Sequence, residues 1–107
     1  MNAYDDVLTI HVGIGNSDDK LGQRRWHEFV TATRYAITQP TVRLLGEWYS
    51  RPDQPYQNAQ FAFQADSAMV ARIRPLLSRI AGDFGQDSIA WCPGVTEFLT
   101  APDGESR

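Results

Sequence analysis

Three side chains of this sequence, His11, Glu47 and Tyr49, could together carry acid–base chemistry. A histidine changes its charge near neutral pH, and a carboxylate or a phenol beside it can accept or donate the proton. All three fall at strand positions that alternate with an apolar face. The pattern predicts a candidate catalytic group on an open sheet face. A histidine on a half-exposed strand is more often an ordinary surface residue, so catalysis is the weaker of the two interpretations.

Two further motifs carry little chemistry. Cys92 is the only cysteine, which excludes an intrachain disulfide and disfavours a cysteine zinc site. Paired with His11 it could act as a nucleophile, but no third group that would orient the pair is evident. Gly13 and Gly15 precede a helix as in a phosphate loop, yet the third glycine and the Walker lysine are absent. We therefore predict no nucleotide and no other cofactor.

Four aspartates lie in predicted turns and could offer oxygen ligands to Mg²⁺ or Ca²⁺. They are Asp18, Asp19, Asp53 and Asp87. Their spacing matches no metal-binding loop, and helix caps or ion pairs with neighbouring arginines explain them better. The sequence therefore predicts no metal site.

Size and charge exclude several classes of protein. The chain has 107 residues, a net charge of −3 and 42% apolar residues, as expected for one globular domain. An acidic chain lacks the basic footprint of a nucleic-acid-binding protein. No apolar run is long enough to span a membrane, and Asp5 and Asp6 stand where a signal peptide would carry base. We expect a cytoplasmic protein that binds neither nucleic acid nor membrane.

Four segments have the alternating pattern of half-buried strands: residues 7–15, 42–50, 58–65 and 88–92. A further short edge strand is possible over residues 96–99. The three tryptophans, Trp26, Trp48 and Trp91, are predicted to be core anchors. Tyr49 and Tyr56 are predicted to be exposed.

A first helix is expected to begin after Gly22 and to end before Pro40. Leu21 and Trp26 have the spacing of a hydrophobic staple, in which a side chain before the helix packs on its first full turn.

A second helix is expected to be capped by Asp66 and to stop at Gly85. Pro75 lies inside it and removes a backbone hydrogen bond. We therefore expect a short first turn and a main helix that restarts near Pro75.

The order of these elements, βαββαβ, predicts a single α+β domain over residues 1–100 with a ferredoxin-like fold. Right-handed crossovers place both helices on one face of an antiparallel four-stranded sheet. Residues 101–107 are polar and are expected to form a disordered tail. In this topology the polar turn residues gather at one end of the domain. The binding candidates there are Asn16, Asp18, Asp19, Arg24, Arg25, Arg51, Tyr56, Asn58, Gln86 and Asp87.

Five segments, together with Trp26, are similar in sequence to segments of other proteins. They are residues 12–21 (VGIGNSDDKL), 46–50 (GEWYS), 57–59 (QNA), 86–91 (QDSIAW) and 96–98 (TEF). On these segments the chain resembles a group of small uncharacterised proteins of actinobacteria and their phages. It departs from the group at Gly22, where related sequences have Ser or Thr, and at Arg24 and Arg25, where they have acids. The resemblance implies a mobile-element or high-GC origin and transfers no catalytic residue.

The sequence favours a small non-enzymatic module that binds another protein, because no catalytic motif is present and the loop end carries arginine and aromatic side chains. The alternative is a small-molecule enzyme of the dimeric α/β-barrel type, with its pocket on the open sheet face around His11, Glu47 and Tyr49. An RNA-binding domain of the same fold is disfavoured by the charge. Leu45 and Tyr49 also predict an apolar open face that pairs two copies into a homodimer.

Overall fold

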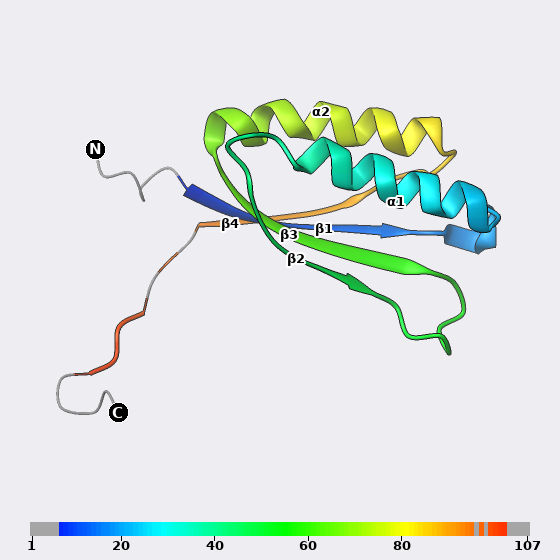
Figure 1. The fold of residues 1–107 in the computed structure, drawn as a ribbon, viewed down its shortest axis with the longest axis horizontal. Coiled ribbons are helices and arrows are strands. Elements are labelled where there is room, and N and C mark those ends of the chain that lie inside the picture. Colours follow the sequence, from blue (N-terminus) through cyan, green and yellow to red (C-terminus); the bar gives the residue numbers. More distant parts are fainter. Residues whose placement is uncertain (1–6, 96, 98, 103–107) are drawn as a thin grey trace.

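The computed structural model describes residues 7–95, 97 and 99–102. It forms one four-stranded sheet in the order β2-β3-β1-β4, with two helices over one face (Figure 1). The elements are β1 (Val7–Gly15), a short 3-10 turn η2 (Ser17–Asp19), α1 (Gln23–Ile37), β2 (Arg43–Tyr49), β3 (Asn58–Asp66), α2 (Ser67–Asp83) and β4 (Ala90–Val95). All neighbouring strands are antiparallel. The predicted ferredoxin-like α+β sandwich is confirmed.

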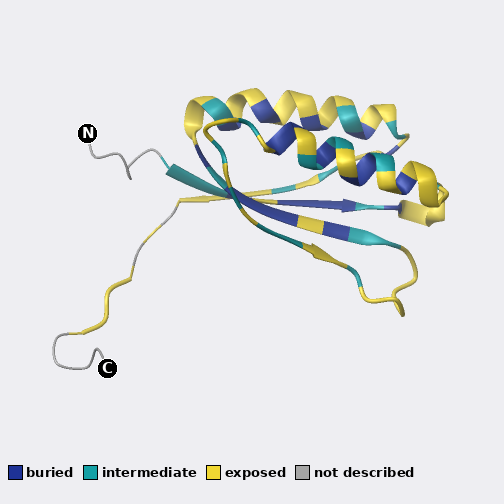
Figure 2. Ribbon diagram, viewed as in Figure 1, coloured by how far each residue is buried: buried dark blue, intermediate teal, exposed yellow. Residues whose placement is uncertain are grey.

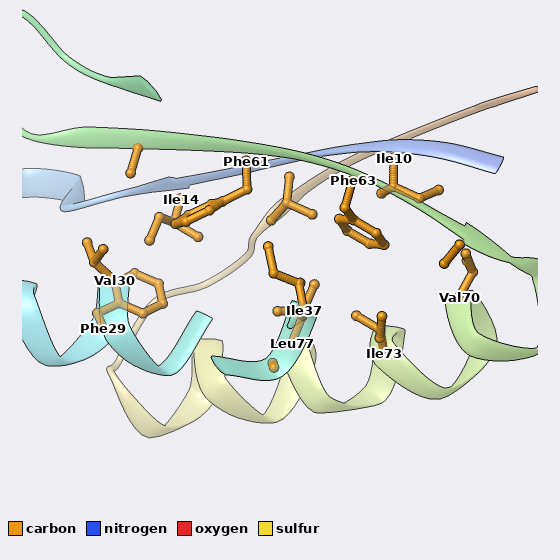
Figure 3. Close-up of a cluster of buried hydrophobic side chains, with 14 of the residues drawn as sticks. Ile10, Ile14, Phe29, Val30, Ile37, Phe61, Phe63, Val70, Ile73 and Leu77 are labelled. Atoms are coloured by element: carbon orange, nitrogen blue, oxygen red, sulfur yellow. The ribbon is translucent and has the colours of Figure 1, made fainter. Parts of the chain in front are cut away.

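The core lies between the helices and the inner face of the sheet (Figure 3). Ile10, Val12, Phe61 and Phe63 project from the two central strands and are fully buried. Phe29 and other apolar residues of α1 and α2 pack down onto them. Burial is deepest where the helices meet β1 and β3, as the dark segments of Figure 2 show. The predicted inner faces of these two strands are therefore correct.

Strand β2 contains a register shift between Leu44 and Gly46, so that Leu45 is an extra residue opposite β3. Because successive side chains point to opposite faces, one inserted residue exchanges the faces of everything after it. Trp48 consequently pairs with Gln60 on the open face and is half exposed. The prediction that Trp48 is a core anchor is wrong for this reason.

The ends of α2 follow the sequence prediction. The Asp66 side chain caps the helix by accepting a hydrogen bond from the Met69 amide at 2.8 Å. At the other end Gly85 adopts a φ of +65°, a conformation that glycine enters without strain. The Gln86 amide then reaches back to the Ala81 carbonyl at 2.9 Å, and the Gly85 amide to the Gly82 carbonyl at 3.1 Å. Together these form a Schellman motif.

Helix α2 runs without interruption through Pro75, contrary to the expected restart near that residue. Pro75 lies on the exposed side of the helix. The carbonyl of Ala71 loses its usual backbone donor there, and Ala71 is itself an exposed residue. The exposed position avoids burying an unsatisfied carbonyl, whereas the clash between the proline ring and the preceding turn remains.

Strand β4 starts at Ala90, two residues later than expected, and continues through Pro93 and Gly94. Of the possible extra strand, Thr96 and Phe98 lie outside the described residues, whereas Glu97 and Leu99 are not in a strand. The predicted tail is described only at residues 101–102, which are exposed; residues 103–107 lie outside the described part of the chain.

Candidate functional site

One end of the domain gathers segments that are far apart in the sequence. The end of β1, the turn η2, the start of α1 and the loop between β2 and β3 lie together there, with the end of α2 above them (Figure 1). The topology predicted this convergence, and the structure confirms it.

A cleft of about 360 Å³ opens at this end, between the start of α1 and the β2–β3 loop. Its volume is within the range of roughly 300–1,000 Å³ that ligand sites occupy. Three aromatic rings and two prolines line it together with carboxamide and charged side chains. The lining residues are Asp19, Gln23, Trp26, Tyr49, Ser50, Arg51, Pro52, Gln54, Pro55, Tyr56, Gln57 and Asn58. Four of the predicted binding residues are therefore in one cleft: Asp19, Arg51, Tyr56 and Asn58.

The Tyr56 ring rests beside Gly15, the last residue of β1. A Cβ at Gly15 would lie 3.6 Å from Tyr56 Cε2 and 3.0 Å from Asn58 Oδ1. The glycine therefore leaves room for the ring and the amide to settle against the backbone. Asn58 also stabilises the loop, because its Nδ2 donates a hydrogen bond to the Tyr56 carbonyl at 3.1 Å.

Two glutamines join the helix to the loop across the cleft. Gln23 Nε2 donates to Gln57 Oε1 at 3.2 Å, and Gln57 Nε2 donates to Gln23 Oε1 at 3.1 Å. Both side chains are solvent-accessible, so this amide pair can exchange its partners for those of a ligand at little cost. Neither glutamine is among the predicted binding residues, although Gln57 is one of the polar turn residues expected at this end of the domain.

Tyr49, another residue that lines the cleft, is held by an arginine that the sequence analysis did not name. Arg34 Nε donates to Glu47 Oε1 at 2.6 Å, and Arg34 Nη2 donates to Glu47 Oε2 at 3.1 Å. The same Nη2 reaches Tyr49 Oη at 2.8 Å, and that hydroxyl donates to Glu47 Oε2 at 2.7 Å. Paired bonds of this kind fix the plane of both groups. They tie the edge strand β2 to α1 and orient the Tyr49 side chain.

The protonation states of this cluster suit positioning better than proton transfer. The hydrogen bond from Arg34 lowers the pKa of Glu47 below its usual value. Burial, followed by its hydrogen bond to Glu47, raises the pKa of Tyr49. Both pKa values move away from neutrality, whereas a general base or acid works best when its pKa lies near the operating pH.

Replacing Glu47 should flatten the acid side of the stability profile. A carboxyl whose pKa is lower in the folded state contributes stability that is complete above its unfolded pKa of about 4.3 and is lost as the pH falls through the folded value. Arg34 is more than a third exposed, so solvent screening limits the effect to about 1 kcal/mol or less. Urea denaturation between about pH 3 and 7 should show wild type losing its advantage over Glu47→Gln as the pH falls.

Glu28→Gln is the matched control for that measurement, since Glu28 forms an exposed ion pair with Arg25 at 3.4 Å. Its pH profile should follow that of wild type closely. Parallel curves for wild type and Glu47→Gln would contradict the assigned role of the Arg34–Glu47 pair.

His11 lies on the open face and does not join this cluster. It pairs with Ala62 of β3, which in turn pairs with Gly46 of β2, so Glu47 falls on the opposite side of the sheet. The expectation that His11, Glu47 and Tyr49 share a face is wrong, because the extra residue in β2 turns Glu47 and Tyr49 toward α1. His11 has Cys92 directly across from it on β4, and both are exposed.

Two of the predicted binding residues are buried. Asn16 is completely inaccessible and holds the chain on either side of η2. Gln86 is 7% exposed, and its side-chain amide donates to the Phe84 carbonyl at 3.3 Å. The expectation that they offer binding groups is wrong, because each side-chain amide satisfies backbone groups of its own turn.

The remaining predicted binding residues are exposed but lie outside the cleft. They are Asp18, Arg24, Arg25 and Asp87. Arg25 stacks over the Phe84 ring, 4.3 Å from its centroid, and reaches the Asp83 carbonyl at the end of α2. A cation is favourable at that helix terminus, which explains its place in the first turn of α1. Among the described residues, no group of three or more His, Cys, Asp or Glu side chains could hold a metal ion.

A second hollow, of about 600 Å³, lies on the outer surface of the helices. Its exposed surface is mostly apolar and includes Tyr35, Ala36, Leu76 and Ile80, while polar residues also line it: His27, Glu28, Thr31, Gln39 and Arg79. Tyr35 is 80% exposed. Its polar residues contribute little of its surface, whereas convergent polar groups are the usual mark of a ligand site.

No protein-family model and no curated protein matches the chain. Among solved structures, a dimeric ferredoxin-like protein of unknown function from Thermobifida fusca is similar with a TM-score of 0.61 at 11% identity, over 89% of this chain and 97% of that one. SnoaB, a cofactor-independent oxygenase from Streptomyces nogalater, has a TM-score of 0.54 at 14% identity, over 92% and 99%. The C-terminal domain of the MgtC protein from Mycobacterium tuberculosis has a TM-score of 0.53 at 9% identity, over 89% and 94%. These similarities establish the fold and nothing further.

No helix within the described residues has the length and apolar character needed to cross a membrane.

Proposed function

We propose that this chain is a small non-enzymatic module that binds another protein through the cleft at its loop end. The observation that supports this most directly is the cleft itself, with Tyr49 and Tyr56 on its walls, 53% and 40% exposed, and Arg51 at its rim. Exposed tyrosine and arginine side chains dominate the energy of protein interfaces when they are buried by a partner.

The alternative is an enzyme with its pocket on the open sheet face, and it is disfavoured because the three residues expected to form its catalytic group do not lie together. His11 stays on that face without Glu47 or Tyr49, and the two acid–base candidates that remain together are fixed by Arg34. The structural similarity to the oxygenase SnoaB concerns the fold and does not support a catalytic role for these residues. A cytoplasmic location and an actinobacterial or phage origin stay predictions.

The cleft can be tested with the full chain as bait in a native lysate. Arg51→Ala combined with Tyr56→Ala should abolish capture of the partner, because the two residues are exposed and lie on the same loop. The melting temperature should hardly change, since exposed turn residues usually contribute within about 0.5 kcal/mol.

Two control variants separate the alternatives. Tyr35→Ala removes an equally large exposed ring from the helix surface, and His11→Ala removes the histidine of the open face. Both should keep the partner. If either one releases it while the loop pair retains it, the partner uses another surface and the proposal fails.

We further propose that two copies of the chain pair through the open sheet face. No helix of the described residues covers this face (Figure 1). Trp48 lies on it, 53% exposed, with its ring over Gly46; a Cβ there would be 3.2 Å from Trp48 Cη2. Gly13 and Ala62 lie on the same face but are buried, Gly13 beneath the Gln60 side chain. A second copy would bury this ring, and Trp48 takes the place that the sequence analysis gave to Tyr49.

Sedimentation equilibrium at tens of micromolar is expected to show a species of twice the 12.0 kDa chain mass. Trp48→Glu should shift it to the monomer, because the dimer would have to bury a charge. Tyr35→Glu, which places the same charge on the helix surface, should leave the dimer intact. A wild-type chain that sediments only as a monomer would refute the pairing.

A further inference from the structure

We infer that the cleft takes an extended, proline-containing peptide segment that carries a basic residue at one end. This inference rests on the proposed binding function and names the chemistry of the partner. Three features of the cleft support it: the ring surfaces of its walls, its stock of hydrogen-bond donors, and the sign of its unmatched charge.

The walls suit proline rings. Tyr49 and Tyr56 line the cleft with Pro52 and Pro55, so that its apolar surface is made mostly of rings; Trp26 also lines it but is only 7% exposed. Grooves lined by aromatic side chains bind polyproline segments, whose preformed extended shape loses little conformational entropy on binding. Both tyrosines are already held: Tyr49 by Arg34 and Glu47, and Tyr56 against Gly15. A prearranged wall keeps the cost of ordering low.

The donors suit the backbone of such a segment. A polyproline helix makes no internal hydrogen bonds, and proline offers a carbonyl acceptor but no N–H. A complementary surface must therefore donate. Gln23, Gln54, Gln57 and Asn58 supply side-chain NH₂ groups to the cleft. The Gln23–Gln57 pair, at 3.1 and 3.2 Å, holds these donors in place until carbonyl groups of a ligand take them over.

The charges favour a basic residue at the end of the cleft near η2. Arg51 lies 3.3 Å from Asp53, so its charge is matched within the loop. Asp19 has no ion pair among the described residues; its carboxylate accepts a hydrogen bond from Asn16 Nδ2 at 3.2 Å. An arginine or lysine of the ligand would supply the missing cation.

Synthetic peptides and the full chain test this by isothermal titration calorimetry. The probe is a peptide of about ten residues in which two residues separate successive prolines and an arginine stands at one end. It is prepared in two forms, with the arginine at the N-terminus or at the C-terminus. Replacing its prolines by alanine should weaken binding at least about tenfold, and so should Tyr56→Ala in the chain. Tyr35→Ala, outside the cleft, should have no effect.

Asp19→Asn isolates the charge, because asparagine tolerates the positive φ of 54° at this position. Wild type should bind the arginine peptide several-fold more tightly than a glutamine peptide, and Asp19→Asn should bind the two alike. Equal binding of the proline and alanine peptides would overturn the inference, as would unchanged arginine preference in Asp19→Asn. If neither peptide binds while the lysate partner is still captured through Arg51 and Tyr56, the inference fails and the proposed function stands.

Discussion

Trp26→Ala is expected to lower the free energy of unfolding by about 3–5 kcal/mol, as for other large-to-small changes at buried aromatic positions. The side chain is only 7% exposed, and its ring meets Phe29 edge to face, with the centroids 6.0 Å apart. Phe29 stacks in turn on Phe84 at 5.1 Å, so the start of α1 and the end of α2 depend on one aromatic cluster. Leu21 packs against the same core just before the helix, in keeping with the predicted staple.

Urea denaturation measures this loss, and Trp48→Ala is the matched control. Trp48 is half exposed on the open face, so its removal from the monomer should cost much less than the removal of Trp26. The comparison should be made at a protein concentration low enough for both to be monomeric. A loss below about 1 kcal/mol for Trp26→Ala would show that the ring is not packed as the structure has it.

Asn16→Ala is expected to cost about 2–4 kcal/mol, although asparagine in a turn is usually replaceable. Its Oδ1 accepts from the Leu21 amide at 2.8 Å, and its Nδ2 donates to the Leu21 carbonyl at 2.8 Å. Its own amide donates to the Gln57 carbonyl at 2.8 Å, a bond that alanine would retain. The substitution therefore leaves both backbone groups of Leu21 without their partner in a part-buried site.

Ser17→Ala provides the comparison for Asn16, because Ser17 is the next residue and is exposed. It should change the free energy of unfolding by no more than about 0.5 kcal/mol. Equal, small losses for both variants would mean that water replaces the Asn16 side chain and that the turn does not depend on it.

The sequence predicted most of the fold because periodicity and topology were sufficient for it. The strands β1 and β3 have one apolar face each, so Ile10 and Phe61 could be assigned to the core directly. Strand β2 could not be assigned in the same way. Leu44 and Leu45 are adjacent and apolar, so either register buries a leucine, and the choice depends on pairing with β3.

The cleft was predicted in part. The convergence of loops follows from chain order, which is why Asp19, Arg51, Tyr56 and Asn58 could be named. Arg34 could not, because its role requires Glu47 to face the helices, and that depends on the shifted register. The burial of Asn16 and Gln86 was missed for a different reason. A polar residue in a turn is expected to be exposed, whereas the side chains of these two residues form hydrogen bonds with backbone groups inside the fold.

The extra residue at Leu45 also bears on how the chain avoids fibrous aggregation. Both β2 and β4 are outer strands of the sheet, and an outer strand with regular backbone spacing can template further strands without limit. In β2 the bulge interrupts that spacing, and in β4 Pro93 lacks the N–H that a newcomer would need. Growth along the hydrogen-bonding direction is thus obstructed at each edge, while the flat face that carries Trp48 stays free to associate. The chain can therefore form a two-fold dimer through its open face without adding further copies at the edges of the sheet to form a fibril.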